Sequence, residues 1–442
     1  MNKKIFLVVF VAIAMFCNGF AQESKTLSLS LKDAQQYAWE HNLSVANSDL
    51  SIQKAKRAKW QTLATMLPQV NGSLDYQNYC GYEMVMEMDT GVPGVEPISV
   101  AIPLNPVGTM AVTAAVAISG AQIVGTLLNN IAIEMADINS EKNKQQISST
   151  VSQLYTTALA MEETIGLLEQ SLENLKTLYQ TTQNSVTVGV AEQVDADQLY
   201  VQVSSLENTI NSTKRTLEML YNSLILQLGA DIDSKLILTD KLDDIIDINS
   251  THNLIATNFN MSNNYDYQLL QKNLALTQKQ ITMSAMDYIP SANVFYQYSA
   301  KTYFGKSEGM NMTPPSLVGV SVSVPIWSSG TRTAKLQEAK LSHQIAQNEF
   351  ITTSDALKIQ ERQLKYNLLS AYENYETQSK NIEVSERVFG NISNKYEYGR
   401  ASSLDVTNAS TNLITAQSNY IQSIIDLTNA KIELKNLLNI TD

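Results

Sequence analysis

The chain has 442 residues, a formal net charge of -12 and only 17% charged residues. The acidic balance excludes the basic surface of a nucleic-acid-binding protein. The low charge content, below the roughly 25% of soluble domains, favours helices that lie against neighbours on several sides.

The N-terminus has the pattern of a secretory signal peptide. Lys3 and Lys4 precede an apolar run over 5–16, and small residues follow before Gln22, which predicts a cleaved leader over 1–21. No later segment reaches the ~18 apolar residues of a membrane-spanning helix, so we expect a periplasmic, secreted or outer-membrane β protein.

The two cysteines differ in their position relative to this leader. Cys17 lies inside it and leaves lipidation as an alternative, although Phe16 precedes it where a lipoprotein signal prefers a small residue. Cys80 is then the only cysteine of the mature chain, which excludes an intrachain disulfide and a thiolate metal site.

Two helices are predicted at the start of the mature chain. Ser30 is a candidate N-cap for a helix over 31–41, because its hydroxyl can accept from a free backbone N–H. A second helical pattern over 45–67 ends at Pro68, which cannot continue a helix.

Two strands follow, because apolar and polar residues alternate strictly over 69–78 and again over 109–119. Between them, the acidic, Pro- and Gly-bearing segment 78–108 predicts a long exposed loop, to which we assign no function. A long helix with a heptad pattern is predicted from Ala121.

The second half repeats this order, with a helix over 266–288, strands over 291–300 and 316–325, and a long helix after Pro325. Each strand is close to the ~9–11 residues that cross a membrane in a tilted barrel. Four strands cannot close a barrel, and an open edge cannot lie in lipid, so several copies would share one barrel. A small soluble sheet packed on the helices is the alternative.

A long helical hairpin follows each pair of strands, and the two hairpins are offset by 210 residues. Gly189 aligns with Gly399 and Asp195 with Asp405. Along both arms apolar residues recur at alternating steps of four and three, which indicates side-by-side coiled-coil packing. The sequence therefore predicts two structural repeats. The first covers 22–240 and has its hairpin tip at about 185–195, and the second covers 241–442 and has its tip at about 396–405.

The sequence has no signature of catalysis. Its three histidines, His41, His252 and His343, lie far apart without metal-ligand spacing. No nucleophile elbow, phosphate-binding loop or dinucleotide fingerprint occurs, so we expect no enzymatic activity, no metal and no cofactor.

Each hairpin tip combines a glycine, which can end a helix in the left-handed conformation, with an aspartate near the start of the return helix. Capping accounts for Asp195 and Asp405, since an acid there complements the helix dipole. A functional role for these two residues is an equal alternative.

The order of leader, helices, the Leu67-Pro68-Gln69 step, two strands and a heptad hairpin, then the same again, resembles the TolC family of outer-membrane efflux ducts. The resemblance covers essentially the whole mature chain. Its most specific segments are Tyr398-Gly399, Ser403-Leu404-Asp405-Val406 and Val324-Pro325-Ile326-Trp327.

The resemblance implies a mainly helical homotrimer with a twelve-strand β-barrel in outer-membrane lipid, continuous with a periplasmic α-barrel. An arm of ~60 residues spans roughly 90 Å. A periplasmic adaptor (membrane fusion protein) and an inner-membrane RND or ABC transporter would deliver substrates to this passive channel. Small-molecule efflux and type I protein secretion share the fold, so cargo and pump stay open.

The resemblance also assigns roles to the tips. Asp405 corresponds to an aspartate that lines the periplasmic aperture, and Asp195 and Tyr396 correspond to positions that hold the tip helices closed. The adaptor is expected to contact the residues at the turns, which are Gly189, Val190, Ala191, Gly399, Ala401 and Ser402.

Two positions depart from the family pattern. Asn408 stands where a second aperture aspartate is expected, and Ala401 stands at the position of a latch arginine, with Arg400 beside it. The carboxylate ring would therefore favour cations less steeply, and the closing network would differ.

An exported coiled-coil tether or scaffold without a pore is the alternative from another functional class. The four one-faced strands distinguish the two hypotheses, because a tether does not need them.

Overall fold

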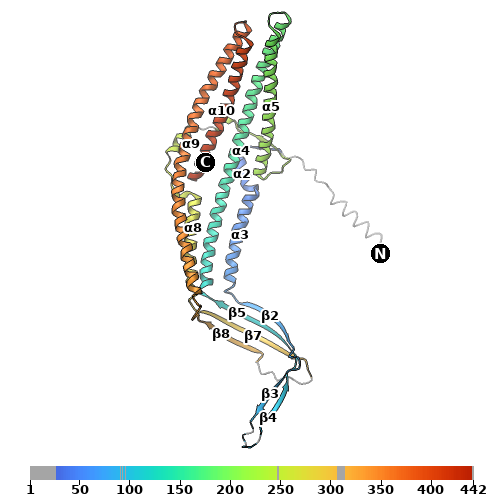
Figure 1. Ribbon diagram of the computed structural model, residues 1–442, viewed down its shortest axis with the longest axis vertical. Helices are drawn as coiled ribbons and strands as arrows, with labels where there is room; N and C mark the ends of the chain where they lie inside the picture. Colours follow the sequence, from blue (N-terminus) through green and yellow to red (C-terminus); the bar gives the residue numbers. More distant parts are fainter. Residues whose placement is uncertain are drawn as a thin grey trace, which may run out of the picture. The chain divides into compact units, whose positions relative to one another are not determined.

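The computed structural model describes residues 26–89, 91, 93–94, 96–245, 248–305 and 314–440 (Figure 1). The predicted leader over 1–21, with Cys17, lies outside these residues. The chain forms two compact units, and each draws on both halves of the sequence. Unit 1 comprises the chain up to Asp49, Asn139–Tyr267 and Ser354–Asp442, and unit 2 comprises Leu50–Ile138 and Gln268–Thr353.

Unit 2 contains a four-stranded antiparallel sheet with the order β2-β5-β7-β8, in which β2 and β8 are the edges. Its strands are β2 (Gln69–Gln77), β5 (Val107–Ile118), β7 (Ser291–Tyr303) and β8 (Ser316–Ser323). These bounds lie within three residues of the predicted ones, because strict alternation marks a strand with two different faces.

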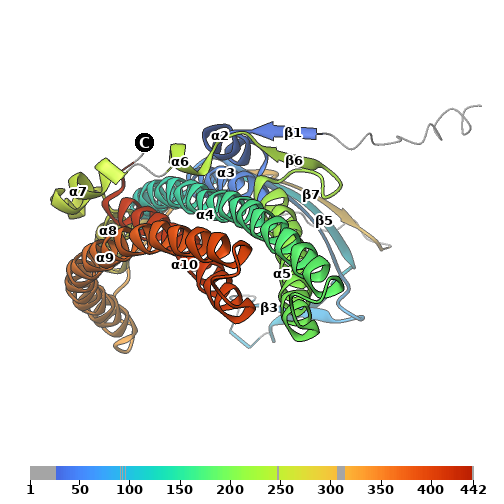
Figure 2. The same cartoon turned by 90° about the horizontal axis from the view of Figure 1, so that it is seen from above.

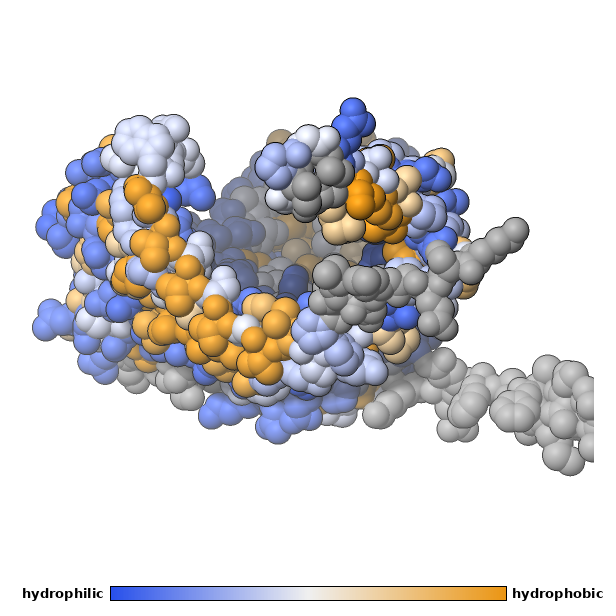
Figure 3. Space-filling view, turned by 90° about the horizontal axis from the view of Figure 1, so that it is seen from below, coloured by the Kyte–Doolittle hydropathy of each residue, from blue (hydrophilic) through white to orange (hydrophobic). Residues whose placement is uncertain are grey.

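One face of this sheet is apolar. The register places Val112 beside Gly72 and Tyr298, and the same alternation puts the apolar residues of all four strands on one side. The exposed members are Val70, Leu74, Tyr76, Met110, Val112, Ile118, Val294, Tyr296, Tyr298, Val318, Val320 and Val322. Figure 3 shows a continuous band of hydrophobic surface in the view from below.

The opposite face of the sheet is mainly polar. Asn71, Thr113 and Gln297 form one row across three strands, and Asp75, Thr109 and Lys301 form another. The sheet therefore separates an apolar surface from a polar one.

The segment 78–108, predicted as a loop, contains a second antiparallel pair, β3 (Glu83–Met88) and β4 (Ile98–Pro103). All its strand residues are exposed, so exposure is confirmed and the absence of regular structure is wrong. The Pro and Gly residues that suggested a loop lie mostly in the connections and at strand ends, where they interrupt no ladder.

Helices precede and follow each strand pair. α3 (Leu43–Ala64) and α8 (Tyr265–Met286) lead into β2 and β7, and α4 (Gly120–Thr187) and α9 (Thr331–Glu397) begin after β5 and β8. In unit 2, Asn129 Nδ2 of α4 donates to Thr62 Oγ1 of α3 at 2.6 Å. None of the described helices is long and apolar enough to cross a membrane.

Unit 1 contains the helical hairpins α4–α5 and α9–α10, except for the first parts of α4 (to Ile138) and α9 (to Thr353), which belong to unit 2. The hairpins are seen along their length in Figure 1 and from above in Figure 2. The return helices α5 (Gln193–Leu228) and α10 (Ser403–Leu438) have 36 residues each. The heptad positions of both hairpins meet in one buried cluster that includes Leu168, Leu175, Leu199, Val203, Leu206, Phe389, Val406 and Leu413.

A small parallel sheet of β1 (Thr26–Leu29) and β6 (Lys235–Leu238) is also part of unit 1. The buried Tyr155 of α4 holds it, because its hydroxyl lies 3.0 Å from both Leu29 O and Asp240 Oδ2. Burial raises the pKa of Tyr155 to about 12, so this hydroxyl stays protonated at neutral pH. Strands β1 and β6 are not predicted from the sequence, because four residues are too few for a periodic signal.

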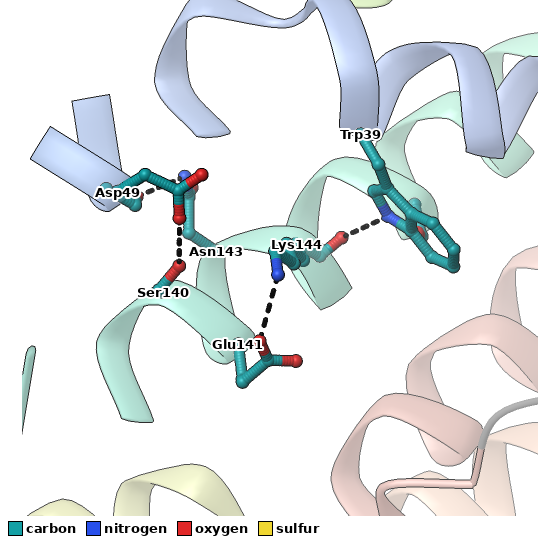
Figure 4. Close-up of polar contacts among 8 residues, drawn as sticks. Trp39, Asp49, Ser140, Glu141, Asn143 and Lys144 are labelled. Carbon is teal, nitrogen blue, oxygen red and sulfur yellow. Dashed lines mark hydrogen bonds and ion pairs between the residues drawn. The ribbon is translucent and has the colours of Figure 1, made fainter. Parts of the chain in front are cut away.

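The predicted helix over 31–41 is α2 (Leu31–His41), and Ser30 caps it together with Asp33. Polar contacts fasten α2 and the start of α3 to α4 (Figure 4). Trp39 Nε1 donates to Ser148 Oγ at 2.8 Å, and Asn143 Nδ2 donates to Ser44 O at 2.9 Å. The remaining short elements of unit 1 are α6 (Leu242–Ile245), α7 (Ile248–Ala256) and η1 (Met261–Asn263).

Candidate functional site at the hairpin tips

At each hairpin tip the chain reverses direction after a glycine in the left-handed backbone conformation. Gly189 has φ 76° and Gly399 has φ 67°, a conformation that glycine adopts without steric cost. Val190 N then donates to Ser185 O at 2.9 Å, and Arg400 N donates to Lys395 O at 2.7 Å. These bonds satisfy carbonyls that the ends of α4 and α9 leave free.

The aspartate after each turn occupies the N3 position of a capping box, three residues after the N-cap. Asp405 Oδ2 accepts from Ser402 N at 2.9 Å, while Ser402 Oγ accepts from Asp405 N at 3.2 Å. At the other tip, Asp195 Oδ2 accepts from Glu192 N at 3.3 Å. The capping role predicted for both aspartates is therefore confirmed.

Asp405 remains exposed and charged while it caps α10. The Ser402 backbone and hydroxyl, which both donate to this carboxylate, lower the pKa of Asp405 below its ordinary value of 3.8. Asn408 is also exposed and follows one turn later, so both side chains project from the same side of α10.

Asp195 also joins the two hairpins. The hydroxyl of Ser403, at the start of α10, donates to Asp195 Oδ1 and lies 3.2 Å from Gln198 Oε1, both on α5. Ser403 is only 3% exposed. A charge-assisted hydrogen bond in such a place is stronger than one in water.

A second polar contact joins α4 and α9, the first helices of the two hairpins. Tyr396 OH of α9 lies 2.6 Å from Thr182 Oγ1 of α4. The Thr182 hydroxyl already donates to Leu178 O at 2.8 Å. Since a threonine hydroxyl has one proton, Tyr396 is the donor across the helix pair.

The other predicted tip residues lie at the turns without such contacts between hairpins. Gly189, Val190, Gly399 and Arg400 are exposed, and Ala191 and Ala401 are partly buried. Arg400 forms no ion pair with any residue that the structure describes. Large apolar side chains also stand free here, because Val188, Val190 and Tyr398 are 74%, 81% and 80% exposed.

The structure thus gives Tyr396 a partner in Thr182, and gives Asp195 a partner in Ser403, which also contacts Gln198. None of these three residues had a predicted role, although Ser403 lies in a segment that carries the family resemblance. The sequence does contain one indication of the role of Thr182. Continuing the heptad of α4 by three residues from Tyr179 reaches Thr182, and a polar residue on an apolar seam indicates a specific partner.

Among the described residues, no group of three or more His, Cys, Asp and Glu side chains could hold a metal ion.

Known proteins resemble this chain in the fold, over most of its length, and in the sequence of its second half. Residues 261–439 match the family model described as outer membrane efflux protein. No curated protein matches the sequence.

Solved structures match nearly the whole chain. The outer membrane protein VceC of Vibrio cholerae is similar with a TM-score of 0.70 and 12% identity, over 92% of this chain and 95% of that one. The CmeC outer membrane channel of Campylobacter jejuni gives 0.71 and 13%, over 95% and 90%. The MtrE outer membrane channel of Neisseria gonorrhoeae gives 0.69 and 15%, over 92% and 88%.

The predicted resemblance to the TolC family and the mainly helical, TolC-like fold are therefore confirmed. The matched family and structures are outer-membrane proteins and channels, not enzymes.

Ser403→Ala should loosen the contact between the hairpins. Hydrogen bonds to charged groups contribute about 1.5–3 kcal/mol, so we expect amide hydrogen exchange at the starts of α5 and α10 to accelerate about tenfold or more. Thr411→Val is the matched control, because the Thr411 hydroxyl donates to Thr407 O of its own helix. Equal exchange in the two variants would contradict a joining role for Ser403.

Proposed function

We propose that this chain is one protomer of a passive efflux channel in the outer membrane, with the helical hairpins in the periplasm. The observation that carries the proposal is the two-faced sheet with its two open edges. The family match over residues 261–439 and the TolC-like fold support it.

The sheet has the properties of one section of a membrane barrel. Its strands have 8 to 13 residues, which suits a tilted crossing of the hydrocarbon core. Its apolar face would contact lipid and its polar face would line the lumen. Unpaired backbone groups along β2 and β8 cannot remain in lipid, so β8 of one copy pairs with β2 of the next in a homotrimer with twelve strands.

The hairpin tips would form the periplasmic aperture of this trimer. Asp405 and Asn408 line it, so three copies present a ring of carboxylates and a ring of amides, and Arg400 lies beside them. The contacts of Asp195 and Tyr396 hold neighbouring hairpins together when the aperture is closed. The exposed apolar turns, with Val190 and Tyr398, suit a protein surface.

That surface would receive a periplasmic adaptor of the membrane fusion class, which links the channel to an inner-membrane RND or ABC transporter. The contact residues are Gly189, Val190, Ala191, Gly399, Ala401 and Ser402. We also propose that the chain consists of two repeats, 22–240 and 241–442, behind a signal peptide over 1–21. The equal lengths of α5 and α10 support this division.

Electron microscopy of the detergent-extracted protein tests the channel directly. We expect a hollow particle with threefold symmetry and a detergent micelle at one end. A solid rod, or a dimer without a micelle, would instead favour the coiled-coil tether.

A matched pair of substitutions tests which face of the sheet contacts lipid. Val112→Arg places a charge on the apolar face of the central strand β5, where it should cost about 2–4 kcal/mol of stability in a bilayer. Thr113→Arg, on the polar face of the same strand, should cost much less. Urea unfolding of the protein in lipid vesicles measures both, and an equal loss in the two variants would contradict a membrane barrel.

Asp405 and Asn408 give opposite predictions for ion selectivity. Asp405→Asn removes the carboxylate ring, and since a charge about 8 Å away contributes about 0.5 kcal/mol in water, cation selectivity should fall a few-fold. Asn408→Asp adds a ring and should raise it. Reversal potentials in planar bilayers measure both changes, and unchanged selectivity in both variants would exclude these residues from the aperture.

The wild-type channel should also keep its cation selectivity in mild acid. The hydrogen bonds from Ser402 lower the pKa of Asp405 below its ordinary value, so the carboxylate stays charged throughout mild acid and loses its charge only in stronger acid.

A further inference from the structure

The β3–β4 hairpin carries three methionines on one face. Met84, Met86 and Met88 occupy alternate positions of β3, so their side chains project to the same side. They are 39%, 46% and 57% exposed. Their partners across the ladder are Ile102, Val100 and Ile98, which makes the surroundings of the thioethers apolar.

The segment that contains this hairpin is also acidic. Glu83 and Glu87 lie on the other face of β3, with Val85 between them, and Asp89 and Glu96 lie in the connection to β4. The segment 78–108 contains no Lys, Arg or His, so its potential is negative. The negative potential should therefore draw a cation to the hairpin. On the methionine face, the side-chain atoms that could coordinate this cation are neutral thioether sulfurs.

Strand geometry allows two of these thioethers to meet at one ion. Residues two apart on a strand are separated by about 6.6 Å, and each methionine has three rotatable side-chain bonds. Met86 can therefore approach either Met84 or Met88. The outer two are about 13 Å apart, too far to share an ion without Met86.

We propose that this face binds one soft monovalent cation, Cu(I) or Ag(I), between Met86 and one of its two neighbours. Thioether sulfur selects Cu(I) among biological metals, whereas Mg²⁺ and Ca²⁺ require oxygen ligands and Zn²⁺ is usually held by His and Cys. The site is independent of the aperture and of the aspartates at the hairpin tips.

Titration of the mature, detergent-purified protein, without the leader over 1–21, with Ag(I) in chloride-free buffer tests the proposal without a reductant. A Cys80→Ser background removes the exposed thiol, which would bind the same ion. We expect one Ag(I) per protomer, lost in Met86→Leu, while Met84→Leu and Met88→Leu each leave one pair and weaken binding only about twofold. Leucine preserves the size and apolar character of methionine, so the hairpin surface is otherwise kept.

Met219→Leu is the matched control, because Met219 is 70% exposed on α5 but has no methionine three or four positions away, where helix neighbours lie. It should bind Ag(I) like the parent protein. Equal Ag(I) binding by Met86→Leu and the parent would overturn the proposal and would fit an apolar face that packs on a second copy. Binding of Zn(II) at the same site with the same strength would also overturn it.

Discussion

Among the residues that the structure describes, both edges of the four-stranded sheet are unpaired, and this is the constraint on which the proposed assembly depends. An unsatisfied backbone group in hydrocarbon costs several kcal/mol, and β2 and β8 each present a row of such groups. Pairing one edge with the other edge of the next copy removes the cost only when the ring closes. Since a long helix follows each strand pair, closure of the strands would also impose a ring order on the hairpins.

Between the two hairpins of the chain, apolar and polar contacts have different roles. The cluster around Leu175, Leu199 and Val406 supplies non-directional burial, which tolerates small shifts of one helix along another. The contacts of Ser403 and Tyr396 are directional and lie close to the turns. Each contributes only about 0.5–3 kcal/mol, so the ends of the hairpins can separate at a cost far below that of unfolding the seam.

Local patterns in the sequence are sufficient to predict the repeated helices and strands. They are not sufficient to predict the contacts between these elements. Alternation located all four strands of the sheet, and Ser30 marked the start of α2. The parallel pairing of β1 with β6 joins residues about 209 apart, and four-residue strands carry no period. The bond from Ser403 to Asp195 likewise depends on how two hairpins pack, although the capping motif at each aspartate was visible.

The two return helices, α5 and α10, have the same length, and the bonds of Ser403 and Tyr396 require the two hairpins to end at the same level. Deletion of one helical turn shortens a helix by about 5.4 Å, which is more than a hydrogen bond can span. A length change in one hairpin would therefore separate both polar contacts, unless the other hairpin changed equally. Hairpin length in chains of this type should consequently vary in evolution by paired insertions or deletions, one in each half.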